Sequence, residues 1–293
     1  MNRRVVLRAA SMAFVAAILA GAPHAPAALI AYEGFDYPND GSSALNTLNG
    51  GTGWTSAWGI TTLGSGFTVS QDDTSLVSPA APFSTTGDRA KSAGAGSGSN
   101  SMRAFRLLPT TFDLGAEGGV LYVSLLFQKT GVASPGTLSN NMEVNLTAGD
   151  SGNGTVRFGS TSANNVFVND STSVPAAQEF GALTLGQTYF AVLKLESHSA
   201  TNDVVSAIVY NSSETAPIAE PGSWDKTKSF ASTAVLDRLR LWIGVAASAD
   251  FDEIRIGDTW ASVAVPEPTT GVLMVLGGMG WMLRPSRRNS TLG

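Results

Sequence analysis

Hydrophobic and polar residues alternate along many short stretches of this chain, and glycine, proline, serine, threonine or asparagine bounds each stretch. The clearest cover residues 119–129, 187–196, 202–211 and 235–244, which are rich in β-branched and aromatic residues. This composition and a period of two predict β-strands. In 235–244 the two faces of the predicted strand carry different sets of side chains: Asp237, Leu239, Leu241 and Ile243 on one, Arg238, Arg240 and Trp242 on the other.

Shorter strand patterns occur at 29–35, 66–70, 101–108, 141–147, 154–159 and 165–169, and no segment has sustained helical periodicity. Short strands at this spacing predict an all-β fold, a two-sheet antiparallel sandwich of the jelly-roll type with Greek-key links. The Gly- and Ser-rich segments 85–101 and 130–141 are predicted to be mobile loops.

The N-terminal segment has a different pattern. Arg3, Arg4 and Arg8 precede an uncharged run over 9–22, and Ala25-Pro26-Ala27 follows with the small residues that signal peptidase prefers. Residues 1–27 are therefore predicted to be a signal peptide that is cut after Ala27. Both the general secretory route and the twin-arginine route are compatible with this segment.

The C-terminal tail, 264–293, combines Pro266-Glu267-Pro268, an uncharged run over 271–283, and a basic cluster of Arg284, Arg287 and Arg288. The run of 13 residues is shorter than the about 20 that span a bilayer as a stable helix. Its basic flank is typical of an end that stays in the cytoplasm during export. The tail is thus predicted to be a removable sorting signal with a short transmembrane segment, and a helix docked on the domain is the alternative.

These three features, in this order and with a signal peptide at the other end, resemble the PEP-CTERM sorting signal of Gram-negative bacteria that make extracellular polysaccharide. The resemblance implies recognition by an exosortase, cleavage at or near the Pro-Glu-Pro, and release to the cell surface or matrix. The tail would hold the precursor in the inner membrane until that cleavage.

Between the two ends lies one predicted domain, 28–263. Six of the 18 Lys and Arg residues but one of the 23 acids lie in 1–27 and 266–293, which leaves 12 basic and 22 acidic residues and a net charge of −10 over 28–265. Nucleic acid is not an expected partner of such a domain. Because cysteine is absent, the fold must rest on its hydrophobic core rather than on disulfides.

Several segments of this domain resemble exported bacterial proteins with a concanavalin A-like or laminin G-like jelly roll. They read "YEGFDYPNDGSSALNTLNGGTGWTSAWG" near the start, "LGQTYFAVLKLE" in the middle and "FDEIRIGDTWASV" at the end. The resemblance implies the fold and often a glycan-binding or protein-binding role, and it implies no activity.

Trp54 and Trp58 lie in the glycine-bounded loop "GTGWTSAWG". Indole rings can stack on sugar rings, so both are candidate ligand-binding residues. The alternative is that their rings are buried and anchor the loop to the edge of the sandwich.

A calcium site is the one cofactor site that the sequence suggests. Asp252 is predicted to share a strand face with Ile254 and Ile256, where an acid needs a partner. Because the first and last strands of jelly rolls often pair, Glu33 or Asp36 would then lie near Asp252 and share a calcium ion with it. A hydrogen bond from Asp252 to a loop backbone is the alternative.

Catalysis is not expected. The acidic "ExDxxE" strand of some jelly-roll glycosidases is missing, because Arg255 stands where its third acid would be, and His198 is the sole histidine after removal of 1–27. We expect an exported surface or matrix protein with a non-catalytic interaction role, which includes glycan binding. Its expected partners are the export machinery with signal peptidase, the exosortase and extracellular polysaccharide. A glycoside hydrolase or lyase on the same fold is the alternative.

Overall fold

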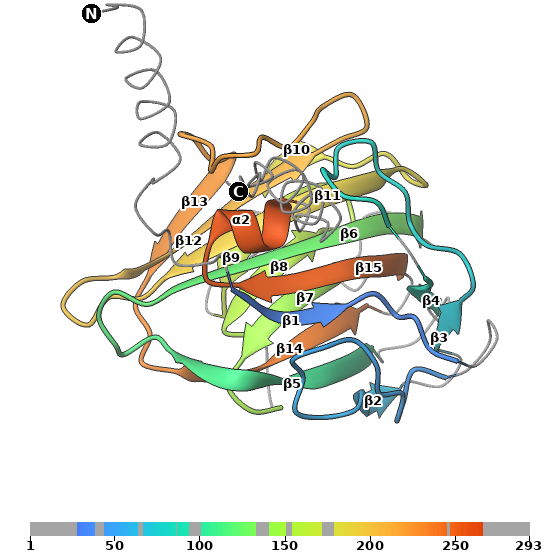
Figure 1. The fold of residues 1–293 in the computed structure, drawn as a ribbon, viewed down its shortest axis with the longest axis horizontal. Coiled ribbons are helices and arrows are strands. Elements are labelled where there is room, and N and C mark those ends of the chain that lie inside the picture. The colour runs from blue at the N-terminus through green and yellow to red at the C-terminus, as the bar shows by residue number, and fades with distance from the viewer. Residues whose placement is uncertain are drawn as a thin grey trace, which may run out of the picture.

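The computed structural model describes residues 28–38, 44–63, 67–85, 87–93, 101–132, 141–150, 154–171, 179–244 and 247–265. Within these ranges two antiparallel sheets face each other (Figure 1). The eight-stranded sheet has the order β13 (Lys226–Phe230), β12 (Asp203–Tyr210), β11 (Thr188–Glu196), β6 (Val120–Val132), β15 (Ala247–Gly257), β4 (Arg89–Ala93), β3 (Thr68–Asp72), and β1 (Leu29–Glu33) also pairs with β15. The seven-stranded sheet has the order β10 (Glu179–Ala182), β9 (Asn165–Asp170), β8 (Val156–Ser160), β7 (Met142–Thr147), β14 (Val235–Ile243), β5 (Met102–Asp113), β2 (Gly59–Leu63).

The predicted all-β, two-sheet antiparallel sandwich is confirmed, and each strand pattern found in the sequence coincides with a strand. The segment 85–101 differs from its prediction as a loop, because β4 lies within it and pairs with both β3 and β15. A short helix, α2 (Trp260–Ala264), follows β15. The predicted signal-peptide helix and C-terminal apolar helix lie outside the described residues.

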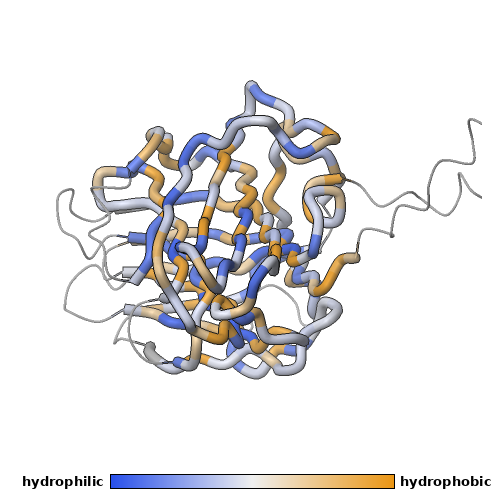
Figure 2. The backbone as a smooth tube through the Cα atoms, turned by 90° about the vertical axis from the view of Figure 1, so that its left-hand side faces the viewer, coloured by the Kyte–Doolittle hydropathy of each residue, from blue (hydrophilic) through white to orange (hydrophobic). Residues whose placement is uncertain are grey.

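Alternation along the strands divides each sheet into an inner and an outer face. Hydrophobic and hydrophilic positions alternate along the strands in Figure 2. On β14, Leu239, Leu241 and Ile243 are fully buried in the core between the sheets. Arg238, Arg240 and Trp242 of the same strand therefore lie on the outer face of the seven-stranded sheet.

A β-bulge in β15 changes which side chains face the core. Asp252 pairs with Leu126 and Arg255 with Ser124, so three steps on β15 match two on β6, and Glu253 has a φ of 50°. The extra residue lets both Phe251 and Ile254 enter the core. The prediction that Asp252 shares a face with Ile254 is therefore wrong, because a period of two does not continue through a bulge.

A buried ion pair connects the two sheets. Glu33 ends β1 of the eight-stranded sheet, and Arg106 lies on β5 of the seven-stranded sheet; both side chains are fully buried and in direct contact. Glu33 also accepts hydrogen bonds from Tyr37 Oη (2.8 Å) and Trp58 Nε1 (3.1 Å). Arg106 donates to the carbonyl oxygens of Gly50 and Ser56, at 2.9 and 3.0 Å. The pair thus holds both sheets and the loop between β1 and β2 at one point.

Glu33→Ala should lower the free energy of unfolding by about 3–5 kcal/mol, because it leaves the Arg106 charge buried without its partner. Denaturant unfolding of the purified protein measures this. Glu196→Ala is the matched control, since it removes a partly exposed pair with Lys194 at 3.1 Å and should cost about 1 kcal/mol or less. Equal losses for the two variants would contradict this account of the pair.

Candidate functional site

The outer face of the seven-stranded sheet carries an unusual set of polar side chains. The strand register sets them in two adjacent rows, one of which crosses five strands through Phe105, Arg240, Asn145, Arg157 and Asn169. The other row crosses six strands through Arg103, Trp242, Glu143, Gly159, Phe167 and Glu179. We call these two rows the arginine face.

Arg240 lies on β14, the second strand of the first row. It is 1 % exposed, and its Nε and Nη1 atoms are buried without a hydrogen-bond acceptor among the described residues. The pKa of Arg240 is lowered to about 10, chiefly by burial and then by the positive charge of Arg103. A buried guanidinium with unmet donors is energetically unfavourable.

The other charges of the arginine face do not neutralise Arg240. Arg157 donates to both carboxylate oxygens of Glu143, at 3.0 and 2.6 Å, which uses that acid in a bidentate pair. In the part of the chain that the structure describes, the Nε of Arg103 is also buried without a partner. Two guanidinium groups therefore have unmet donors beside one neutral pair.

Aromatic side chains and a glycine complete the face. Arg157 lies over the ring of Phe167 at 5.6 Å, and Trp242 is half-buried between Arg103 and Glu143. Gly159 leaves its position on the face without a side chain. A Cβ there would collide with the carbonyl oxygen of Met142, so close strand packing requires glycine.

This arrangement is suited to binding an anion. A guanidinium presents a planar fork of N–H donors that matches carboxylate, sulfate or phosphate oxygens. An anion that contacts Arg240 and Arg103 would supply the acceptors that both lack. The half-buried indole ring of Trp242 beside them is a group of the kind that commonly contacts a sugar ring.

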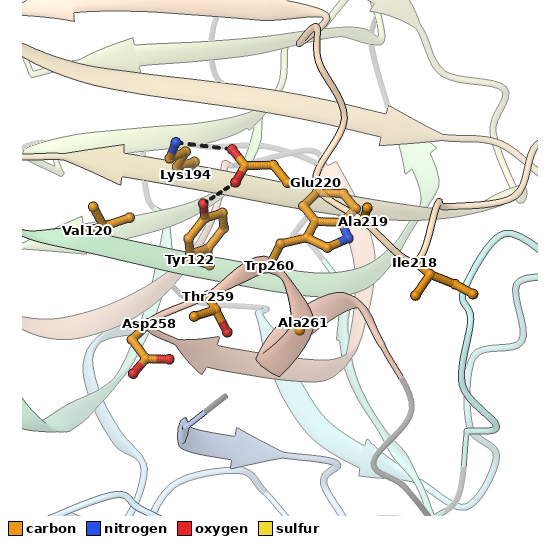
Figure 3. Close-up of a pocket in the computed structure, with 10 residues that line it drawn as sticks. All are labelled: Val120, Tyr122, Lys194, Ile218, Ala219, Glu220, Asp258, Thr259, Trp260 and Ala261. Atoms are coloured by element: carbon orange, nitrogen blue, oxygen red, sulfur yellow. Dashed lines mark hydrogen bonds and ion pairs between the residues drawn. The ribbon is translucent and has the colours of Figure 1, made fainter. Parts of the chain in front are cut away.

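A hollow of about 380 Å³ lies on the opposite side of the molecule, over the eight-stranded sheet (Figure 3). Glu220 lines it, accepts a hydrogen bond from Tyr122 Oη at 2.7 Å and lies 3.1 Å from Lys194 Nζ. Trp260 and the exposed Ile218 line its rim. Because the charge of Glu220 is already neutralised by Lys194, this hollow offers fewer unpaired polar groups to a ligand than the arginine face does.

The two candidate tryptophans differ in exposure. Trp58 is 1 % exposed, and its ring stacks on Phe35. Trp54 is half-buried, and its Nε1 donates to the Tyr32 carbonyl oxygen at 2.9 Å. The Trp58 ring is thus not available to a sugar, and the alternative of loop anchoring describes its role.

The candidate calcium ligands are not brought together. β1 does pair with β15, as expected, but Glu33 is bound by Arg106 and Asp36 is exposed. Asp252 accepts from the backbone N of Leu76 (2.8 Å) and from Ser75 Oγ (2.5 Å), so it fixes a loop backbone, as the alternative hypothesis expected. Within the described ranges no three acidic or histidine side chains could hold one metal ion. The predicted shared site is corrected, because Arg106 supplies the positive charge that calcium would have supplied to Glu33.

The alternation of Arg238, Arg240 and Trp242 is visible in the sequence, but the arginine face is not. The face depends on the register that places β14 between β5 and β7 and so sets Arg240 near Arg103 and Arg157. The one signal in the sequence was Arg240 itself, an arginine within a predicted strand with core leucines on either side of it.

Ala25, Ala27, the Pro-Glu-Pro and the terminal arginines all lie outside the described residues. No helix in the described part of the chain is long and apolar enough to cross a membrane.

The fold is that of an antiparallel β-sandwich protein, and residues 264–288 match the PEP-CTERM protein-sorting motif. That match includes Pro266, Glu267, Pro268 and the three terminal arginines. The chain therefore carries a sorting signal of exported, surface-directed proteins of Gram-negative bacteria. No curated protein is significantly similar to the chain in sequence.

Several solved structures resemble this one, with low sequence identity and low TM-scores. An endo-β-1,4-glucuronan lyase from the fungus Trichoderma reesei is 10% identical over 76% of this chain and 96% of its own, with a TM-score of 0.45. The cellulose-induced protein Cip1 is 16% identical over 69% and 91%, with a TM-score of 0.44. The metal-free carbohydrate recognition domain of Emp46p is 8% identical over 67% and 89%, with a TM-score of 0.35. Likeness at this level carries no argument about function.

Arg240→Met should leave the free energy of unfolding unchanged or raise it by roughly 1 kcal/mol, because it removes a buried charge whose donors are unmet. Arg157→Met is the contrast, since it leaves the buried Glu143 unpaired and should cost about 3 kcal/mol or more. Urea unfolding at neutral pH compares the two. A loss for Arg240→Met as large as that for Arg157→Met would mean that Arg240 has a structural partner.

Proposed function

We propose that this protein is an exported surface or matrix protein whose arginine face binds acidic glycans without catalysis. The observation that carries the proposal is the buried guanidinium of Arg240, whose Nε and Nη1 lack acceptors among the described residues and which lies beside Arg103, whose Nε lacks one too. Unmet polar groups of this kind cost folding free energy and are characteristic of sites that a ligand completes.

The chemistry of the face favours carboxylate-bearing sugars over other anions. The guanidinium fork takes the carboxylate of a uronic acid, and the half-buried Trp242 supplies apolar surface for a sugar ring. Asn145 and the Arg157–Glu143 pair lie on the same two rows and are buried beside the two arginines. A chain sorted to the surface of a polysaccharide-producing cell would meet such ligands there.

Arg240 becomes accessible through movement of its half-buried neighbours. Arg103 and Trp242 face each other across β5 and β14 and are more exposed than Arg240. A uronate carboxylate meets Arg103 first and then reaches Arg240 as the Trp242 ring turns aside. The bound carboxylate thereby accepts charge-assisted hydrogen bonds from donors that lack acceptors among the described residues of the free protein, which removes the free-energy cost of leaving them unpaired.

Short oligouronates should bind the purified protein, and their neutral counterparts of equal length should bind at least about tenfold more weakly in calorimetric titration. Arg240→Met should weaken oligouronate binding by about 10- to 100-fold, the loss of one or two charge-assisted hydrogen bonds. Arg240→Lys should recover part of that loss, because it keeps the charge but not the fork.

Lys91→Met is the matched control, since Lys91 is an exposed cation on the other sheet and should not change binding. Shortening of the oligouronate during the titration would favour the alternative of a carbohydrate-active enzyme. Equal affinity for acidic and neutral sugars, or no effect of Arg240→Met, would reject the arginine face as the site.

Sorting is a separate part of the proposal. The tail is cut near Pro266 to Pro268 by an exosortase, so mass spectrometry of protein recovered from the cell surface should place the C-terminus close to Val265. Glu267→Ala should leave the full tail on a membrane-retained precursor. Wild-type matrix protein that still carries Arg288 would show that the tail is an anchor or a packed helix.

A further inference from the structure

The first residue after the predicted leader is held by an acid at the other end of the domain. The backbone N of Ala28 donates to Asp258 Oδ1 at 3.1 Å, and the backbone N of Asp258 donates to the Ala28 carbonyl oxygen at 3.4 Å. Leu29 then pairs with Gly257, the last residue of β15. Ala28 is therefore the position at which the chain joins the eight-stranded sheet.

The turn that carries Asp258 is firmly built. Thr259 forms a capping box with Ser262 at the start of α2, with the Ser262 backbone N 3.2 Å from Thr259 Oγ1. Trp260 and Val263 of α2 are buried, and the Val263 carbonyl oxygen accepts from Ser124 Oγ of β6 at 2.7 Å. Figure 3 shows Asp258 in the turn before α2, apart from the Lys194–Glu220–Tyr122 group.

We propose that Asp258 is the receptor for a new amino terminus, formed when the Ala27–Ala28 bond is hydrolysed. In that step water adds its hydroxyl to the Ala27 carbonyl carbon and a proton to the Ala28 nitrogen. The peptide N–H becomes an amine that is protonated at neutral pH. A one-proton donor to Asp258 is then replaced by an ammonium group, and the hydrogen bond becomes an ion pair.

Of the neighbouring bonds, the Ala27–Ala28 bond is the one whose cleavage fits the folded domain best. A cut after Ala25 would leave two more residues and carry the charge away from Asp258. A cut after Leu29 would remove the Leu29–Gly257 pair from β1. Cleavage after Ala27 places the ammonium at the atom that already contacts the carboxylate.

The same turn leads directly to the sorting tail. The matched motif begins at residue 264, the last residue of α2, whose side chain is buried. The N-terminal processing point thus lies at the turn that precedes α2 and the start of the sorting motif, and the leader must be gone before the ion pair can form there. This inference does not depend on what the arginine face binds.

Inserting Ser-Gly between Ala27 and Ala28 tests the inference in the exported protein. Intact-mass measurement first establishes where each chain begins. The insertion should lower the melting temperature by about 1–3 °C, as expected for an exposed ion pair in a domain of this size. In an Asp258→Asn background the same insertion should cause no further loss, because the carboxylate is already gone.

Two control variants accompany this comparison of the insertion in the wild-type and Asp258→Asn backgrounds. Ala28→Ser keeps an ammonium group at the same position and should melt as the wild type does, and Asp73→Asn changes an exposed acid elsewhere and should leave the effect of the insertion unchanged. The difference should also shrink at high salt, which screens exposed pairs. An intact mass that does not begin at Ala28, or an insertion effect of equal size in the wild-type and Asp258→Asn backgrounds, would overturn the inference.

Discussion

The buried pair of Glu33 and Arg106 is the constraint on which the architecture depends. The sandwich has no cysteine, so apolar packing and this charged contact must fix how the two sheets and the long loop after β1 meet. Glu33 accepts four hydrogen bonds, from Arg106, Tyr37, Trp58 and the Phe35 backbone. A charge this deeply buried is tolerable because its acceptor sites are used.

The contrast with Arg240 separates structure from function on the same sheet. Arg106 points between the sheets and has acceptors for its donors, whereas Arg240 lies on the outer face at a comparable degree of burial and lacks acceptors for its Nε and Nη1 among the described residues. The two arginines of this sheet thus differ in the source of their hydrogen-bond acceptors. The fold itself supplies the acceptors of Arg106, and we propose that an acidic ligand supplies those that Arg240 lacks.

The sequence predicted the sandwich well because strand patterns are local. On β14, alternation alone separates Leu239 and Leu241 from Arg238 and Arg240. Local pattern could not locate the arginine face, which depends on the register between β14 and its neighbours, or the bulge at Glu253, which interrupts the period of two after Asp252. The calcium prediction failed for the same reason, since the partner of Glu33 is an arginine 73 positions away.

Arginine-selective nuclear magnetic resonance of the Nε–H groups tests the central claim most directly. Titration with a short oligouronate should shift the Arg240 and Arg103 signals together and in proportion to saturation, because their Nε atoms lack acceptors within the described residues of the free protein. The Arg106 signal should stay fixed, since its Nε donates to the Ser56 carbonyl oxygen at 3.0 Å in the closed network. Saturable binding that leaves Arg240 and Arg103 unmoved would contradict the claim.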